Sequence, residues 1–106
     1  MNQIAQGDIL LVASTEVPMA AKAKSDGIVA EGEATGHHHQ LTGDTMFYEN
    51  PELDIFVGGW IVAGPEGGAM VHEEHGTIEI APNTVWTVRR QVEADPFTGV
   101  ARRVAD

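Results

Sequence analysis

Short apolar segments alternate with turn-forming residues along most of the chain. The run Ile9 to Ala13 follows Gly7 and Asp8, and a continuous apolar run after such a turn signal predicts a short buried strand over residues 7–13. Beyond residue 28, turn-forming residues recur every few positions, which is typical of antiparallel strands. The expected strands are residues 28–33, 37–41, 45–48, 53–63, 69–73, 77–80, 85–93 and 100–104.

Period-two alternation supports this assignment near the C-terminal end. Trp86, Val88 and Val92 fall on one face of a strand, while Thr87 and Arg89 fall on the other. We therefore expect the first face to point into the core. Arg90 lies on that same apolar side, so we expect it at a rim.

Two other segments carry local signals. Pro18 and the good helix formers at residues 19–24 favour one or two helical turns, closed by a turn at Asp26 and Gly27. Gly58 and Gly59 interrupt an apolar run, which predicts a bulge or the close approach of another backbone.

These patterns together predict an all-β fold, a small antiparallel β-barrel or sandwich with at most one short helix. The chain has 106 residues, near the usual size of one domain, so residues 1–106 are expected to form a single β domain. The breaks at residues 42–44, 49–52, 64–68, 81–83 and 95–99 are expected to be the turns between strands.

Charge and composition narrow the classes of function. Sixteen acidic and six basic residues give a net charge of −10, which repels phosphate backbones and anionic membrane surfaces. Nucleic acids and membranes are therefore not expected partners. No apolar run is long enough to cross a bilayer and no secretory signal is visible, so a cytoplasmic location is expected, with a place in a virion as the alternative.

The histidines carry the clearest candidate chemistry. All five lie in two short windows, residues 37–39 and 72–75. In a strand, residues two apart point the same way with Cα atoms about 6.6 Å apart. His37 and His39 can therefore aim at one point while His38 faces away, as half of a metal site.

The second window allows two arrangements. If it is extended, His72 and Glu74 share a face; if the chain turns before Gly76, His75 joins instead. The chain contains no cysteine, so imidazole and carboxylate are the available ligands. Such ligands suit zinc, iron, manganese or nickel. The spacing of three between His72 and His75 is not the helical zincin motif, which needs a spacing of four.

Two resemblances follow from these motifs. Gly32, His37 and His39, followed by Pro65, Gly67 and His72, resemble the two motifs of cupins, and this implies a small β-barrel with a metal held by histidines and a glutamate. Gly43 and Asp44 stand where cupins have that glutamate. The chain is more similar to small uncharacterised proteins of bacteria and their phages, through the blocks at residues 7–11 (GDILL), 32–39 (GEATGHxH) and 72–76 (HEEHG).

Two functions are compatible with the histidine windows and the strand pattern. The first is a metal-binding β-barrel whose ligands come from His37, His39, His72, Glu74 and His75. The second is a non-enzymatic β module that assembles with itself or with a larger particle, in which the histidines form hydrogen bonds or line an interface. A homo-oligomer or larger protein assembly is the expected partner.

Overall fold

The computed structural model describes residues 3–6, 9–31, 38–52, 56–72, 75–90, 92–94 and 101–103. Within these residues the chain forms β-strands and no helix, which confirms the predicted all-β class. The strands are β1 (Gln3–Gln6), β2 (Ile9–Ser14), β3 (Lys22–Lys24), β4 (Ile28–Glu31), β5 (His38–Glu49), β6 (Val57–Val71), β7 (Ile78–Ile80), β8 (Val85–Arg90), β9 (Val92–Ala94) and β10 (Ala101–Arg103). In the part of the chain that is described, no helix is present that could span a membrane.

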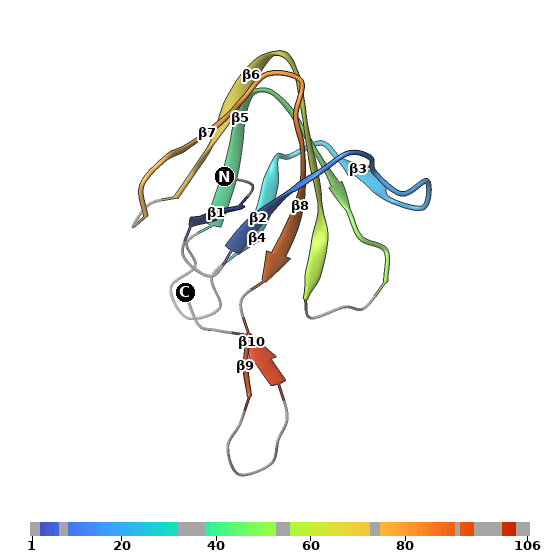
Figure 1. The fold of residues 1–106 in the computed structure, drawn as a ribbon, viewed down its shortest axis with the longest axis vertical. Coiled ribbons are helices and arrows are strands. Elements are labelled where there is room, and N and C mark those ends of the chain that lie inside the picture. Colours follow the sequence, from blue (N-terminus) through green and yellow to red (C-terminus); the bar gives the residue numbers. More distant parts are fainter. Residues whose placement is uncertain are drawn as a thin grey trace.

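Eight of these strands form one antiparallel sheet (Figure 1). Its main path runs β1-β2-β8-β6-β5-β3, with β4 paired to β5 and β7 paired to β6. The remaining strands, β9 and β10, form a two-stranded sheet that follows the end of β8. Every one of these pairings is antiparallel, as the sequence pattern predicts.

The two long strands, β5 and β6, let the sheet fold over on itself. β4 pairs with the first part of β5 and β3 with the last part, while β8 pairs with the first part of β6 and β7 with the last. The sheet is open rather than closed into a barrel, because its path ends at β1 and β3. The fold is therefore an all-β, sandwich-like arrangement.

Strands β5 and β6 each bend at a place where a turn between two strands was expected. Residues 42–44 and 64–68 lie inside the continuous strands β5 and β6, so the prediction of strand breaks there was wrong. Gly43 and Gly67 have φ angles of 80° and 67°, and a Cβ on Gly43 would lie 2.8 Å from the Cα of Gly68. The glycines change the strand direction and let the backbones approach while the ladder continues, with a register shift between Gly43 and Thr45.

The core lies between the two halves of the folded sheet. Its buried members come from β2, β4, β5, β6, β7 and β8, so both halves contribute to one cluster. They are Ile9, Leu11, Val29, Leu41, Phe47, Ile61, Ala63, Met70, Ile80, Trp86 and Val88. The expected strand at residues 7–13 is confirmed as β2, whose Ile9 and Leu11 are fully buried.

Two local predictions are confirmed around β8. Trp86 and Val88 are buried and Arg89 is exposed, as the alternation indicates. The register shifts between Val57 and Gly59, and a Cβ on Gly59 would collide with the backbone oxygen of Tyr48 and lie 2.6 Å from the ring of Phe47. Gly59 thus marks the close approach that the paired glycines predicted.

The segment predicted to be helical is extended instead. Residues 19–20 form a turn, and Lys22–Lys24 pair with Phe47, Tyr48 and Glu49 as strand β3. The local preference for helix covers too few residues to outweigh the backbone hydrogen bonds that the edge of β5 offers. The sequence pattern also missed β1, where Ile4 is the only large apolar residue.

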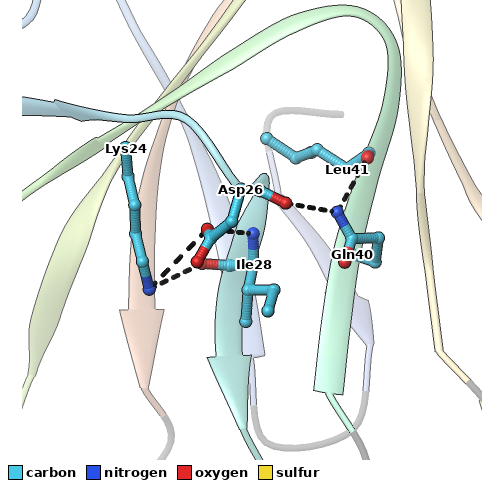
Figure 2. Close-up of polar contacts among 5 residues, drawn as sticks. All are labelled: Lys24, Asp26, Ile28, Gln40 and Leu41. Atoms are coloured by element: carbon cyan, nitrogen blue, oxygen red, sulfur yellow. Dashed lines mark hydrogen bonds and ion pairs between the residues drawn. The ribbon is translucent and has the colours of Figure 1, made fainter.

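A polar turn connects β3 to β4 and fixes both on β5 (Figure 2). Asp26 accepts a 2.9 Å hydrogen bond from the backbone N–H of Ile28, and its backbone oxygen accepts one of 2.8 Å from the side-chain amide of Gln40. Lys24 lies 4.0 Å from the carboxylate of Asp26 and donates to the backbone oxygen of Ile28. The turn at Asp26 and Gly27 is confirmed, and it holds the stretch of β5 that carries His39.

Candidate functional site

Strand β5 places His39 inside the protein. The residue pairs with Ala30 of β4, and its side chain is completely buried, with 0% exposure. Alternation along the strand explains this position, because Leu41, two residues on, is also buried, while Gln40 between them is half-buried and contacts the polar turn. His39 therefore occupies a core-facing position at one end of the sandwich.

The last residue of β1, Gln6, holds the imidazole of His39. Its side chain is 3% exposed, and its amide nitrogen donates to the backbone oxygens of Met70, at 2.9 Å, and Gly76, at 2.6 Å. Its amide oxygen lies 2.8 Å from Nδ1 of His39. Gln6 thereby links the edge strand β1, the end of β6 and the segment before β7 around one histidine.

These contacts fix the tautomer of His39. A backbone oxygen can only accept, so the end of the Gln6 amide that faces Met70 and Gly76 must be the NH₂ group. The opposite end, the amide oxygen, also only accepts, so Nδ1 of His39 carries the proton that it donates. In the neutral imidazole the lone pair is then on Nε2.

The second histidine window turns back toward His39. His72 directly follows β6 and is buried, with 8% exposure, and the backbone N–H of His75 donates to its Nδ1 at 3.3 Å. The ring centroids of His39 and His72 are 4.4 Å apart, and those of His72 and His75 are 4.5 Å apart. These three residues, named the histidine row below, lead from a buried ring at His39 to a half-buried one at His75.

The histidine row contains three of the candidate ligands. The ring of His72 lies beside that of His39 and beside that of His75, so residues of both windows meet. His37 and Glu74 lie outside the described residues. The backbone of His38 belongs to β5, one position before His39.

The three rings do not form a preorganised metal cage. Among the described residues, no group of three or more His, Cys, Asp or Glu side chains stands where it could hold a metal ion. One physical reason is visible at His72, whose Nδ1 accepts the N–H of His75, so the neutral ring carries its proton on Nε2. His39 and His72 therefore have opposite tautomers, and Nε2 bears a lone pair in His39 but not in His72.

Sequence reasoning missed Gln6, although a signal for it exists. Residues two apart in a strand share a face, so Gln6 lies on the same face as Ile4, which packs against the core. A glutamine in such a core-facing position needs polar partners. That requirement points to a buried polar group nearby, but the sequence could not indicate that the group is His39.

The fold and site define an open, sandwich-like β protein with a buried glutamine–histidine network at one end. Residues 5–91 match the model of a family described as Domain of unknown function (DUF8820), and the chain belongs to this family. Comparisons with curated proteins and with solved structures found no match.

Proposed function

We propose that this protein binds a divalent transition-metal ion, with His39 as its anchoring ligand and the rest of the histidine row beside it. The observation that carries the proposal is that three of the chain's five histidines lie side by side in one row, although His39 and His72 come from separate windows. The fixed tautomer of His39 adds to this support, because a metal binds the unprotonated nitrogen of an imidazole.

The spacing of the rings supports the proposal. A metal–nitrogen bond of about 2.1 Å puts two nitrogens on one ion about 3 to 3.5 Å apart. Neighbouring rings in the histidine row have centroids 4.4 and 4.5 Å apart. This spacing is compatible with one nitrogen from each of two neighbouring rings binding the same ion.

His72 would have to release a hydrogen bond to take part. Its contact with the N–H of His75 is long, at 3.3 Å, and a hydrogen bond of this kind contributes about 1 kcal/mol to stability. Structural zinc sites bind with about 10 kcal/mol or more. The loss is small beside that gain, so the hydrogen bond does not prevent ligation by His72. The hydrogen bond between Gln6 and Nδ1 of His39 is kept in this scheme.

The remaining ligands of this proposal come from the sequence alone. His37 is two residues before His39, a spacing at which side chains of an extended segment face the same way. Glu74 lies between His72 and His75 in the sequence. Imidazole with carboxylate suits zinc, nickel, iron or manganese, and the general affinity order places nickel and zinc above iron and manganese. We expect zinc and nickel to bind most tightly to purified protein.

Metal uptake by chelator-stripped protein tests the proposal. Isothermal titration with zinc and nickel is expected to give one ion per chain, and elemental analysis of the natively purified protein should find a bound metal. His39→Ala should weaken binding by at least about tenfold, since it removes one strong ligand. His38→Ala is the matched control, because neighbouring residues of a strand point to opposite faces.

Two results would contradict the metal site. One is a wild-type protein that takes up no zinc or nickel at micromolar concentration. The other is equal affinity in wild type and His39→Ala, which would place any bound metal elsewhere. His37→Ala and Glu74→Ala complete the series, and each should reduce affinity if its side chain is a ligand.

The open sheet favours a second candidate, self-assembly. The sheet path ends at β1 and β3, and the outer edge of such strands offers backbone groups to a second chain. Lys22 and Lys24 oppose such pairing at β3, so β1 is the edge at which a second copy would add. Sedimentation velocity over a range of concentrations should then show a dimer or larger species, and a monomer throughout would exclude this candidate.

A further inference from the structure

We infer that Gln6 is a positioning residue that keeps His39 in the tautomer with its lone pair on Nε2, and so sets the atom through which His39 binds a metal. The metal part of this inference rests on the function proposed above. The tautomer part concerns the metal-free protein, so the two parts can succeed or fail separately.

The orientation of the Gln6 amide is determined at both ends. The backbone oxygens of Met70 and Gly76 accept its two N–H groups, at 2.9 and 2.6 Å. A rotation of the amide by half a turn would place its oxygen against these two oxygens and its NH₂ group against His39. That state would lose two hydrogen bonds, so the oxygen stays directed at Nδ1 of His39.

Burial makes this orientation effective. Gln6 is 3% exposed and His39 is 0% exposed, so bulk water does not compete for Nδ1 or for the amide. Gln6 is the last residue of β1, and the register of Gln6 with Ile9 in β2 holds its backbone in place. The imidazole of His39 is thus fixed in rotation and in protonation by a group on a different strand.

This arrangement has the form that metal sites use around their ligands. A histidine that binds metal through one nitrogen usually donates the N–H of the other to an oxygen, which sets both the tautomer and the ring orientation. Gln6 supplies that oxygen to His39, whereas Nδ1 of His72 accepts the backbone N–H of His75. The assignment therefore distinguishes His39 from its neighbour.

A purely structural role for Gln6 is the competing explanation. In that case the amide would only satisfy the oxygens of Met70 and Gly76, and the protonation of His39 would be incidental. Gln6→Met tests the difference, because methionine keeps the length and volume of the side chain and removes its hydrogen-bonding groups. Gln3→Met, on the same strand at an exposed position, is the matched control.

The first measurement is the ¹⁵N imidazole spectrum of the metal-free protein at a pH where His39 is neutral. In wild type and in Gln3→Met, His39 is expected to show a protonated Nδ1 and an unprotonated Nε2. In Gln6→Met the Nδ1-protonated form should lose its dominance. A wild-type His39 protonated on Nε2 would overturn the inference, and this result needs no variant to fold.

The second measurement is zinc affinity by isothermal titration. Removing the oxygen that orients a metal-bound histidine typically costs about 10- to 100-fold in affinity. We expect a loss of that size in Gln6→Met and none in Gln3→Met. Unchanged affinity in folded Gln6→Met would overturn the positioning role. A wild type without zinc binding but with the expected tautomer would instead refute the proposed function and leave the role of Gln6 in fixing the tautomer supported.

Discussion

Gln6 and His39 are 33 residues apart in the chain and share a buried hydrogen bond of 2.8 Å. This bond joins β1, at one end of the sheet path, to β5 near the other end. Because the sheet is not closed by backbone pairing, side-chain contacts of this kind hold its outer strand to the rest of the fold.

Replacing Gln6 by alanine should destabilise the protein by about 2 to 4 kcal/mol. The change removes two buried hydrogen bonds of the Gln6 amide, with the oxygen of Met70 and the Nδ1–H of His39, and a part-buried one with the oxygen of Gly76. Urea denaturation followed by tryptophan fluorescence measures the difference. Gln3→Ala, at an exposed position of the same strand, should change stability by less than about 0.5 kcal/mol. Equal effects of the two changes would contradict the structural role of Gln6.

A methyl group at Gly59 should separate two paired strands. A Cβ there collides with the backbone oxygen of Tyr48 and presses on the ring of Phe47, so neither neighbour can move away freely. We expect Gly59→Ala to cost about 2 kcal/mol or more in unfolding free energy. Gly76→Ala is the control, since nothing lies within 4 Å of a Cβ at that position. A thermal melt of the two variants provides the comparison, and a Gly59→Ala protein as stable as Gly76→Ala would disprove the close approach.

Phe47 should be one of the largest contributors to core stability. It is 2% exposed near the end of β5, and its neighbour Met46 is 40% exposed on the other face. Phe47→Ala is expected to lower the free energy of unfolding by about 3 to 5 kcal/mol, through lost burial and the cavity left behind. Met46→Ala should lower it by about 1 kcal/mol or less. Comparable losses at both positions would mean that the strand presents its faces differently.

The turn at Gly27 should tolerate asparagine better than alanine. Gly27 has a φ angle of 72°, which glycine adopts freely and asparagine adopts more readily than alanine. A Cβ there would also lie 2.7 Å from the amide nitrogen of Gln40, at the end of a side chain that can shift. Gly27→Ala should cost about 1 to 2 kcal/mol, and Gly27→Asn less. Chemical denaturation ranks the two variants, and the reverse order would argue against the left-handed backbone.

Zinc should raise the melting temperature of the wild-type protein and leave that of His39→Ala nearly unchanged. A ligand present at about 100 times its dissociation constant stabilises the native state by about 2.7 kcal/mol, provided that it binds only that state. Magnesium is the control ion, because it prefers oxygen ligands to imidazole. The same shift with magnesium, or in His39→Ala, would show that the effect does not come from the histidine row.

The sequence pattern predicted some strands of the fold correctly and others wrongly. The continuous apolar run of β2 and the alternation of Trp86, Val88 and Arg89 predicted strands and faces that the structure contains. The residues around Gly43 and Gly67 were misassigned as strand breaks, because glycine marks both a turn and a bend inside a long strand. Sequence alone does not tell whether the backbone ladder continues through such a position.

The candidate site was also predicted only in part. The clustering of all histidines in two windows pointed to His37, His39, His72 and His75 with Glu74, and period-two geometry placed His37 and His39 on one face. The burial of His39 became known only from the structure. The contribution of Gln6 was not predicted, because it depends on β1 packing beside the ends of β5 and β6, far away in the sequence. Propensity over a few residues also misled at Lys22–Lys24, where strand pairing outweighed the helix formers.

The sequence by itself determined the class of fold and the chemistry available, because hydrophobic periodicity and residue composition are local properties of the chain. It set an all-β architecture, an acidic surface, the absence of cysteine and two histidine windows. Only the tertiary structure decided how β5 and β6 bend to make two layers, and which histidine nitrogen carries the proton. Those outcomes depend on contacts between distant segments, and the hydrogen bond from His39 to Gln6 exists only once those segments are packed together.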